Sequence, residues 1–409
     1  MDHSRSFRRL GLVLSIVLVG LLSLPAIQTL RPILPNGRAG YPVPLKAARP
    51  GDFTRAWFDG SLQRWLEALA EADVGFRPVL VRSFNEAAFH LFRDLPRASV
   101  LATDHDVYTY PELQGLNALV ARKAYFEDGY RALAPRLRSL QEELARRGKH
   151  FEVIIATSKA LVSLDGVPDR YLVAPREDMY RRAADVSAIL KENGVNVVDG
   201  TGLLRRIRAD GISTHATSGV HWNRYSGCAV ARQLLEDSRR DLGDSVAKLG
   251  CDPPQLGPPW ATDVDGLTMF ELLTRGGLVT PTSFPTLTPG LSGQTRFLFV
   301  GDSFCFNVID AIALSHAAGA LTFRIYYLDR YTFSPKDGAA LSYQALTAPV
   351  SVADIYNDVA GADVVVLEMV DFNLNYFGFG FVEQMLDLLR HQPDGEPGAP
   401  APTAAKAPT

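Results

Sequence analysis

One serine in this chain stands where a nucleophile could work. The segment RFLFVGDSFCFNV, residues 296–308, places Ser303 where an apolar, strand-like run gives way to a helical pattern. At such a turn a hydroxyl is exposed beside free backbone N–H groups, as nucleophilic attack requires. The alternative interpretation is an ordinary helix cap, because Asp and Ser are common N-cap residues.

A serine nucleophile needs a base, and the segment SGVHWN, residues 218–223, offers one. His221 precedes a helical pattern, and an imidazole with a pKa near neutrality can take the Ser303 proton and later return it to a leaving group. His215 is a weaker candidate. Taken alone, His221 also fits a structural histidine beside a core Trp222.

The elements that must position these groups follow the pattern of an α/β fold. Five apolar runs predict buried strands, at residues 150–157, 195–199, 296–301, 322–328 and 362–368, and helical patterns occupy residues 123–147, 176–193, 224–242, 304–318 and 379–390. This alternation predicts a mostly parallel sheet of about five strands, covered by helices on both faces. Ligands bind at the carboxyl ends of such strands. Ser303 falls there, as do Ser158, Lys159, Glu368 and Asp371.

Composition limits the classes of function. The 409 residues carry a net charge of −3, with basic residues scattered among acidic ones, and this pattern excludes a nucleic-acid-binding surface. The three cysteines have no Cys/His spacing suited to zinc, so we expect no metal site. If the body of the protein is exported, Cys228 and Cys251 could pair and leave Cys305 free, but the sequence does not decide this.

The N-terminus predicts a membrane segment. Arg5, Arg8 and Arg9 precede the uncharged residues 10–30, which are long enough to cross a bilayer as a helix. Basic residues before such a run favour a cytoplasmic N-terminus, which would leave the body on the periplasmic side of the inner membrane. An uncleaved anchor is the favoured interpretation. A cleaved signal peptide, with secretion into the periplasm, is the alternative.

The remaining patterns divide the chain into parts. After the anchor or signal segment, residues 1–30, we expect a Pro- and Gly-rich linker at 31–52, a catalytic domain at 53–391 and a disordered tail at 392–409. Residues 53–72 predict one amphipathic helix whose aromatic stripe belongs to the core. Residues 250–290 form a long excursion rich in Pro, Thr and Gly, and loops of that length are often functional.

The order of these motifs resembles the alginate O-acetyltransferase family of AlgJ/AlgX type, within the SGNH-hydrolase superfamily. The matching pieces, over about residues 53–390, are VGFRPVLVRSFNEAAFHLF, FEVIIATSKALVSL, GVNVVDG, SGVHWNRYSG, FLFVGDSF and DVVVLEMVDFNL. The resemblance implies a three-layer α/β/α domain with Ser303 as nucleophile and His221 as general base. It gives structural or oxyanion support to Gly301 and Asp302, and possible substrate-site roles to Ser158, Lys159, Trp222 and Asn223.

One departure concerns the third member of the triad. The alginate enzymes carry an aspartate two residues before the histidine, and this position is Gly219 here. Loss of that acid lowers turnover by about 10⁴ in a well-studied serine protease. Three explanations stay open. Ser218 or a backbone carbonyl orients the ring, or Asp199 or Asp210 supplies the acid, or the protein does not catalyse.

The expected function is that of an extracytoplasmic enzyme which moves acetyl groups onto hydroxyls of a cell-envelope or secreted polysaccharide, through an acetylated Ser303. No acetyl-CoA motif is visible and we expect no cofactor. The family resemblance implies a multispanning membrane O-acyltransferase as the acetyl donor. The alternatives are a carbohydrate O-acetylesterase and a non-catalytic polysaccharide-binding or assembly factor, which the change at Gly219 favours.

Overall fold

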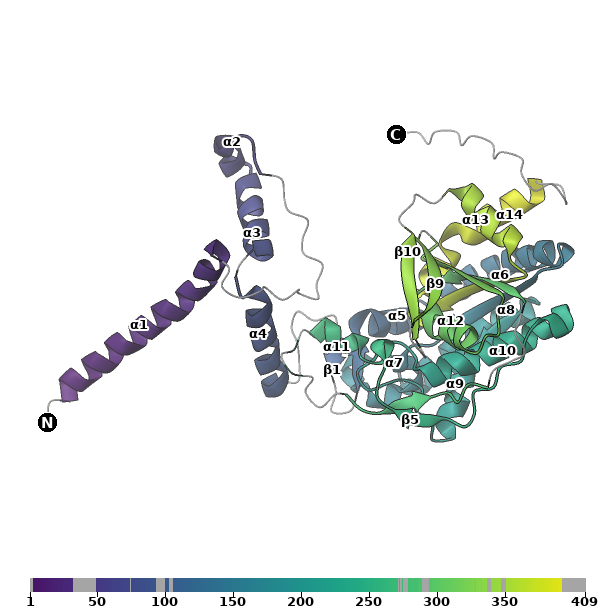
Figure 1. Ribbon diagram of the computed structural model, residues 1–409, viewed down its shortest axis with the longest axis horizontal. Coiled ribbons are helices and arrows are strands. Elements are labelled where there is room, and N and C mark those ends of the chain that lie inside the picture. Colours follow the sequence, from purple (N-terminus) through teal and green to yellow (C-terminus); the bar gives the residue numbers. More distant parts are fainter. Residues whose placement is uncertain are drawn as a thin grey trace. The chain divides into compact units, whose positions relative to one another are not determined.

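The structure is a computed structural model (Figure 1), and it describes residues 3–31, 49–73, 75–92, 100–102, 106–270, 272, 274, 279–288, 294–327, 329–336, 340–346 and 351–391. The chain forms two compact units. Unit 1 comprises residues 1–100 and 267–276, and unit 2 comprises residues 101–266 and 277–409. Most of the linker expected at 31–52, and all of the tail expected at 392–409, lie outside the described residues.

A seven-stranded sheet forms the centre of unit 2, in the order β10-β9-β8-β7-β11-β3-β4. Its strands are β3 (His150–Ala156), β4 (Val197–Asp199), β7 (Arg296–Gly301), β8 (Ala320–Ile325), β9 (Asp329–Lys336), β10 (Ala340–Leu346) and β11 (Val364–Val370). The five strands from β8 to β4 run parallel and are the five that the sequence predicts. Strands β9 and β10 add an antiparallel extension that the sequence analysis missed.

The fifth predicted strand ends earlier than expected. Its apolar run continues to Leu328, but β8 ends at Ile325. Tyr326 and Tyr327 adopt positive φ angles of 45° and 66°, and the chain turns back into β9. Such backbone angles are uncommon for residues other than glycine, so this turn depends on its tertiary surroundings and not on a local turn signal.

Alternate residues of the central strands enter two different apolar cores. Val364 and Val366 of β11 join one core, whereas Val365 and Leu367 join the other. The first core includes residues of α10 (Arg224–Leu242) and α12 (Cys305–Leu314), and the second includes residues of α6 (Lys123–Arg146), α8 (Arg176–Glu192) and α14 (Phe381–His391). Because successive side chains point to opposite faces of a strand, both faces are covered by helices. The three-layer α/β/α fold class is confirmed.

Shorter elements complete unit 2. They include β1 (Val100–Ala102), which unit 1 shares, β2 (Val107–Thr109), α5 (Tyr110–Ala121), α7 (Lys159–Val162), α9 (Gly200–Ala209), β5 (Gln255–Gly257), α11 (Asp265–Phe270), which continues into unit 1, β6 (Thr282–Phe284), α13 (Val352–Gly361) and the 3₁₀ segment η5 (Asp371–Gly380).

Helices α10 and α12 pack closely, and the candidate site residues lie just before their first turns. A Cβ atom on Gly227 would lie 2.6 Å from the Cβ of Asn307, so only glycine permits this approach. A disulfide joins Cys228 in α10 to Cys251, with 6.0 Å between the two Cα atoms, and Cys305 is free and buried. The pairing that the sequence left undecided is therefore present.

Unit 1 contains the helices α1 (His3–Leu30), α2 (Phe53–Phe58), α3 (Ser61–Asp73) and α4 (Arg77–Phe92). Within α1, residues Gly11–Thr29 are long and apolar enough to cross a membrane, with a mean hydropathy of 2.2. An anchor and a signal sequence both have this property.

The single helix expected over residues 53–72 is wrong. The chain breaks between α2 and α3, where Gly60 has a φ of 73°, so the apolar positions no longer share one face. The prediction that its aromatic stripe is core is also wrong, because Trp57 is 72% exposed and Trp65 is only partly buried.

Candidate active site

The turn between β7 and α12 holds Ser303 at the carboxyl edge of the sheet. Asp302 braces this turn, because one of its oxygens accepts the Phe304 N–H at 3.0 Å and the other accepts the Val370 N–H of the neighbouring strand, also at 3.0 Å. A Cβ atom on Gly301 would lie only 2.6 Å from Oε2 of Glu368, so the turn needs glycine there. These contacts agree with the bracing role expected of Gly301 and Asp302.

A buried carboxyl group supports the same turn from beneath. Oε2 of Glu368 accepts the Asp302 N–H at 3.0 Å and the Cys305 thiol at 3.1 Å. Burial raises the pKa of Glu368 well above its usual value, and the nearby charge of Asp302 adds to the effect. Burial also raises the pKa of the Cys305 thiol, and a thiol that stays protonated is a poor nucleophile.

The His221 ring forms a direct hydrogen bond with Ser303. Ser303 Oγ donates a hydrogen bond to Nε2 of His221 at 2.7 Å, and the two residues are 82 positions apart in the chain. The ring packs against Phe304, with 4.6 Å between the ring centroids. Next to it, the indole N–H of Trp222 donates to the Phe304 carbonyl at 3.0 Å, and this bond ties the histidine loop to the serine turn.

A carboxylate occupies the other side of the imidazole. Nδ1 of His221 donates to Oδ2 of Asp265, the first residue of α11. The second oxygen of Asp265 accepts the N–H groups of Val220, at 2.7 Å, and of Gly266, at 2.8 Å. Because both backbone bonds fix the carboxylate, Ser303, His221 and Asp265 form one oriented hydroxyl–imidazole–carboxylate chain.

This arrangement sets the basicity of the imidazole. Burial lowers the pKa of His221, but the hydrogen bond to Asp265 and the negative charges of Asp265, Asp302 and Glu112 outweigh it, so the pKa lies above its usual value. A more basic imidazole accepts the serine proton more readily and holds the positive charge that results.

The three groups considered from the sequence as partners of His221 lie elsewhere. Asp199 accepts the Gly202 N–H at 3.0 Å and caps α9, Asp210 ends the same helix, and Ser218 donates to the Asp263 carbonyl at 3.1 Å. Asp265 stands in their place. Sequence reasoning missed it, although the unusual length of the 250–290 excursion was a signal.

Gly219 explains why the acid comes from another segment. A Cβ atom at this position would lie 2.9 Å from the Thr262 carbonyl oxygen and 3.0 Å from the Cα of Asp263. The loop that delivers Asp265 therefore passes over the place where an aspartate side chain would begin. Gly219 therefore leaves room for the loop that places the carboxylate of Asp265 beside His221.

The four possible substrate-site residues are supports and not contact surfaces. Ser158, Lys159, Trp222 and Asn223 are at most 1% exposed, so a polymer approaching from solvent cannot touch their side chains. The N–H and hydroxyl of Ser158 donate to Asp371, and Asn223 caps α10 by accepting the Ser226 N–H.

Lys159 holds the loop that leads to His221. Its ammonium group donates to the Thr217 carbonyl at 2.8 Å and lies 3.6 Å from Oδ1 of Asp106. Burial lowers the pKa of Lys159, while the charges of Asp106, Glu112 and Asp265 oppose this shift.

His215, the weaker candidate base, lies away from this chain of bonds. It is buried, with its Nε2 atom 3.4 Å from the Thr157 carbonyl. Burial lowers its pKa well below the usual value, so the ring stays neutral.

The open side of the site carries a backbone donor and an aromatic side chain. Among the described residues, nothing accepts a hydrogen bond from the Ser303 N–H, which is thus available to stabilise an oxyanion. Tyr326 is 43% exposed, and its N–H donates to the Gly301 carbonyl at 2.8 Å. Burial and the charge of Asp302 raise the pKa of Tyr326, and an interaction between its hydroxyl and Ser303 partly offsets the rise.

No group of three or more His, Cys, Asp or Glu side chains in the described ranges is placed to hold a metal ion.

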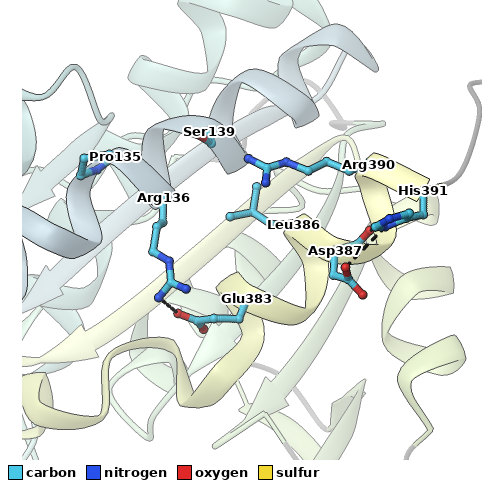
Figure 2. Close-up of a pocket in the computed structure, with 8 residues that line it drawn as sticks. All are labelled: Pro135, Arg136, Ser139, Glu383, Leu386, Asp387, Arg390 and His391. Atoms are coloured by element: carbon cyan, nitrogen blue, oxygen red, sulfur yellow. Dashed lines mark hydrogen bonds and ion pairs between the residues drawn. The ribbon is translucent and has the colours of Figure 1, made fainter. Parts of the chain in front are cut away.

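A separate groove of about 350 Å³ lies between α6 and α14 (Figure 2), where Arg136 and Glu383 form an ion pair with a 2.9 Å separation. Neither Ser303 nor His221 lines it.

The comparison with protein families supports the resemblance drawn from the motifs. Residues 120–250 match the family described as an SGNH hydrolase-like domain of the acetyltransferase AlgX. The matched stretch includes His221 and ends before Asp265 and Ser303. The resemblance to AlgX is thereby confirmed for this part of the chain. No curated protein sequence matches the chain.

Three of the solved structures that match this chain share little sequence with it. The O-acetyltransferase domain of Pseudomonas putida AlgJ is 16% identical, with a TM-score of 0.43, and the match covers 71% of this chain and 100% of that one. Pseudomonas aeruginosa AlgX is 11% identical, with a TM-score of 0.40 and coverage of 64% and 62%. Bacillus cereus PatB1, solved with a sulfonyl adduct, is 11% identical, with a TM-score of 0.38 and coverage of 67% and 97%.

Proposed function

From a hydroxyl–imidazole–carboxylate chain in an SGNH-like fold, we propose that the protein is an extracytoplasmic O-acetyltransferase that acetylates hydroxyls of a cell-envelope or secreted polysaccharide. The observation that carries the proposal is the pair of bonds that join His221 to Ser303 and to Asp265. The family match at residues 120–250 supports acetyl transfer as the chemistry.

In the first half of the reaction, Ser303 becomes acetylated. Its hydroxyl proton passes to Nε2 of His221 while Oγ bonds to the carbonyl carbon of the acetyl donor. The negative charge that develops on the carbonyl oxygen is stabilised by the Ser303 N–H. The donor's leaving group then takes the proton from His221 as its bond to the acetyl carbon breaks.

In the second half, a sugar hydroxyl replaces the leaving group. It gives its proton to His221 and bonds to the acetyl carbon, and Ser303 Oγ departs and recovers the proton. Asp265 holds the imidazole in the tautomer that both halves need and stabilises the imidazolium that forms twice. The net result is one acetyl ester broken in the donor and one formed on the polysaccharide.

The N-terminal segment supports a proposal for the location. We propose that α1 is an uncleaved inner-membrane anchor and that the catalytic domain, placed at residues 53–391, lies in the periplasm. A multispanning membrane O-acyltransferase would supply the acetyl group. An anchor would keep Ser303 near such a donor and raise its effective concentration.

The test is to treat the protein with an activated acetyl ester and measure intact mass. We expect one added acetyl group on the wild type and on Ser245→Ala, an exposed serine that serves as the matched control. In Ser303→Ala we expect no acetyl-enzyme and at least about a 10³-fold loss of turnover. An acetylated Ser303→Ala protein would contradict the assignment of the nucleophile.

The acceptor is tested in a second reaction, with oligosaccharides added to the acetyl donor. Acetylated oligosaccharide supports the transferase, whereas release of acetate alone identifies the esterase. Absence of both acetyl-enzyme and turnover in folded wild-type protein would identify a non-catalytic factor. The presence of Asp265 removes the main reason for expecting that last outcome, namely the missing carboxylate at Gly219.

A further inference from the structure

Helices α2, α3 and α4 expose an unusual number of large apolar side chains. The exposed set is Phe53, Trp57, Phe58, Leu66, Val79, Leu80, Phe84, Leu91 and Phe92. In the described part of unit 2, exposed residues of this kind are scattered along the chain: Tyr125, Val173, Leu256, Tyr326 and Val352. Concentrated apolar exposure marks a surface that contacts a membrane or a partner.

On α4 the exposed apolar residues share one face. Leu80, Phe84 and Leu91 are spaced so that a turn of 100° per residue brings them within about 40° of one another. They are 50%, 60% and 74% exposed, whereas Phe89, on the opposite side, is 0% exposed. A helix on the surface of a soluble domain normally turns charged and polar residues outward, and α4 presents this apolar face instead.

The start of α4 is tied to the end of the candidate membrane span. The N–H of Gly75, in the turn before α4, donates to Oγ1 of Thr29 at 2.7 Å. A Cβ atom on Gly75 would lie 2.4 Å from the Cβ of Gln28, which is itself 1% exposed. Since Thr29 is the last residue of the apolar span, this turn lies where α1 would leave the bilayer.

We propose that the exposed face of α4, formed by Leu80, Phe84 and Leu91, lies on the lipid surface beside the exit of α1. This inference depends on α1 remaining as an anchor, as proposed above. At about 1.5 Å per residue, Leu80 lies within roughly 10 Å of Gly75 along the chain axis. Interfacial helices bury an apolar face about 5–10 Å deep at the boundary between headgroups and acyl chains.

The charges of α4 indicate whether its exposed face prefers anionic or zwitterionic lipid. The helix carries Arg77 and Arg82 against Glu86, so it has no basic cluster for anionic headgroups. Glu86 accepts hydrogen bonds from Thr274 of the same unit. Binding therefore depends on apolar burial, and we expect it on zwitterionic lipid.

The experiment places a polarity-sensitive fluorophore on the full chain, reconstituted in phosphatidylcholine vesicles. Phe84→Cys is labelled, and Glu192→Cys, at the exposed end of α8, is the control. Among the native cysteines two form the disulfide and Cys305 is buried, so the label goes to the new thiol. We expect nitroxide-bearing lipids to quench the label at position 84 several-fold more than the label at position 192.

A second label, at Leu91→Cys, is expected to show the same quenching and guards against a local defect at position 84. If aqueous iodide quenches all three labels alike and lipid nitroxides quench none, the proposal is overturned, and a protein partner becomes the occupant of this face. Acetyl-enzyme formation is measured on the same vesicles. Lipid quenching without acetylation would reject the proposed function and leave this inference standing.

Discussion

Two tryptophans show how differently the two units use aromatic residues. Trp222, at the carboxyl edge of the sheet, is 0% exposed, and its indole N–H donates to the Phe304 carbonyl. Trp57, in α2 of unit 1, is 72% exposed. Both lie in segments that the sequence pattern assigns to a core. Only the first has a sheet and two packed helices around it.

The two regions differ in what their burial accomplishes. At the sheet edge that carries Ser303 and His221, polar groups such as Asp302, Glu368 and Lys159 are buried and hydrogen-bonded, which fixes the surrounding backbone. Unit 1 leaves apolar side chains in contact with solvent, an arrangement that suits a lipid environment better than water. Ser303, His221 and Asp265 all belong to unit 2, whereas α2, α3 and α4 of unit 1 carry exposed apolar side chains.

The largest effect should come from the group that the tertiary structure adds to the catalytic edge. We expect Asp265→Asn to lower turnover by about 10²–10⁴, because the imidazole loses the acceptor that orients it. Turnover with an activated acetyl ester is the measurement, and Asp210→Asn is the control that should retain full activity. A wild-type rate in Asp265→Asn would show that the acid is not needed.

A companion variant sharpens the same point. Adding Gly219→Asp to the Asp265→Asn variant puts an aspartate two residues before His221, where the alginate enzymes carry theirs. We expect no rescue, because a side chain at 219 meets the backbone of Thr262 and Asp263. Recovery of turnover would mean that the 260–266 loop can move aside.

The next largest effect compares the two tryptophans directly. We expect Trp222→Ala to lower the free energy of unfolding by about 3–5 kcal/mol, since it removes a buried aromatic side chain. For Trp57→Ala we expect a change within about 0.5 kcal/mol in detergent. Chemical denaturation of the full chain, followed by circular dichroism, measures both. Equal losses would break the comparison between the units.

The pH profile tests the electrostatics of the catalytic edge. His221 must be neutral to accept the serine proton, and its pKa is raised, so activity should rise with pH through a midpoint above about 6.5, the usual value for histidine. Asp265→Asn removes a hydrogen bond and a negative charge, so the midpoint of its residual activity should move to lower pH. A midpoint that does not move would show that Asp265 does not control the basicity of His221.

The smallest effect concerns the exposed aromatic residue at the catalytic edge. Tyr326→Phe keeps the exposed ring and removes only the hydroxyl, so we expect turnover to fall by no more than about 12-fold, the upper limit for the loss of one ordinary hydrogen bond. Steady-state kinetics on the activated ester gives the ratio. Tyr125→Phe, the same change at an exposed tyrosine of α6, is the matched control and should leave turnover unaffected.

Local sequence patterns determine much of this protein's structure. Hydrophobic periodicity predicts the five parallel strands and the helices from Lys123 to Arg146 and from Arg224 to Leu242. The Gly-Asp-Ser turn between a strand and a helix predicts the position of Ser303. His221 was also identifiable, because a histidine before a helix at the sheet edge has few comparable rivals in this sequence.

Tertiary structure alone decided which acid meets the imidazole and which aromatic residues are buried. Asp265 is 44 positions from His221 and reaches it through an irregular loop, whose path no short-range pattern encodes. Likewise, the spacing of Trp57 and Leu66 specifies an apolar face but not what covers it. Periodicity reports the environment that a residue prefers, while the partner that provides this environment depends on long-range packing.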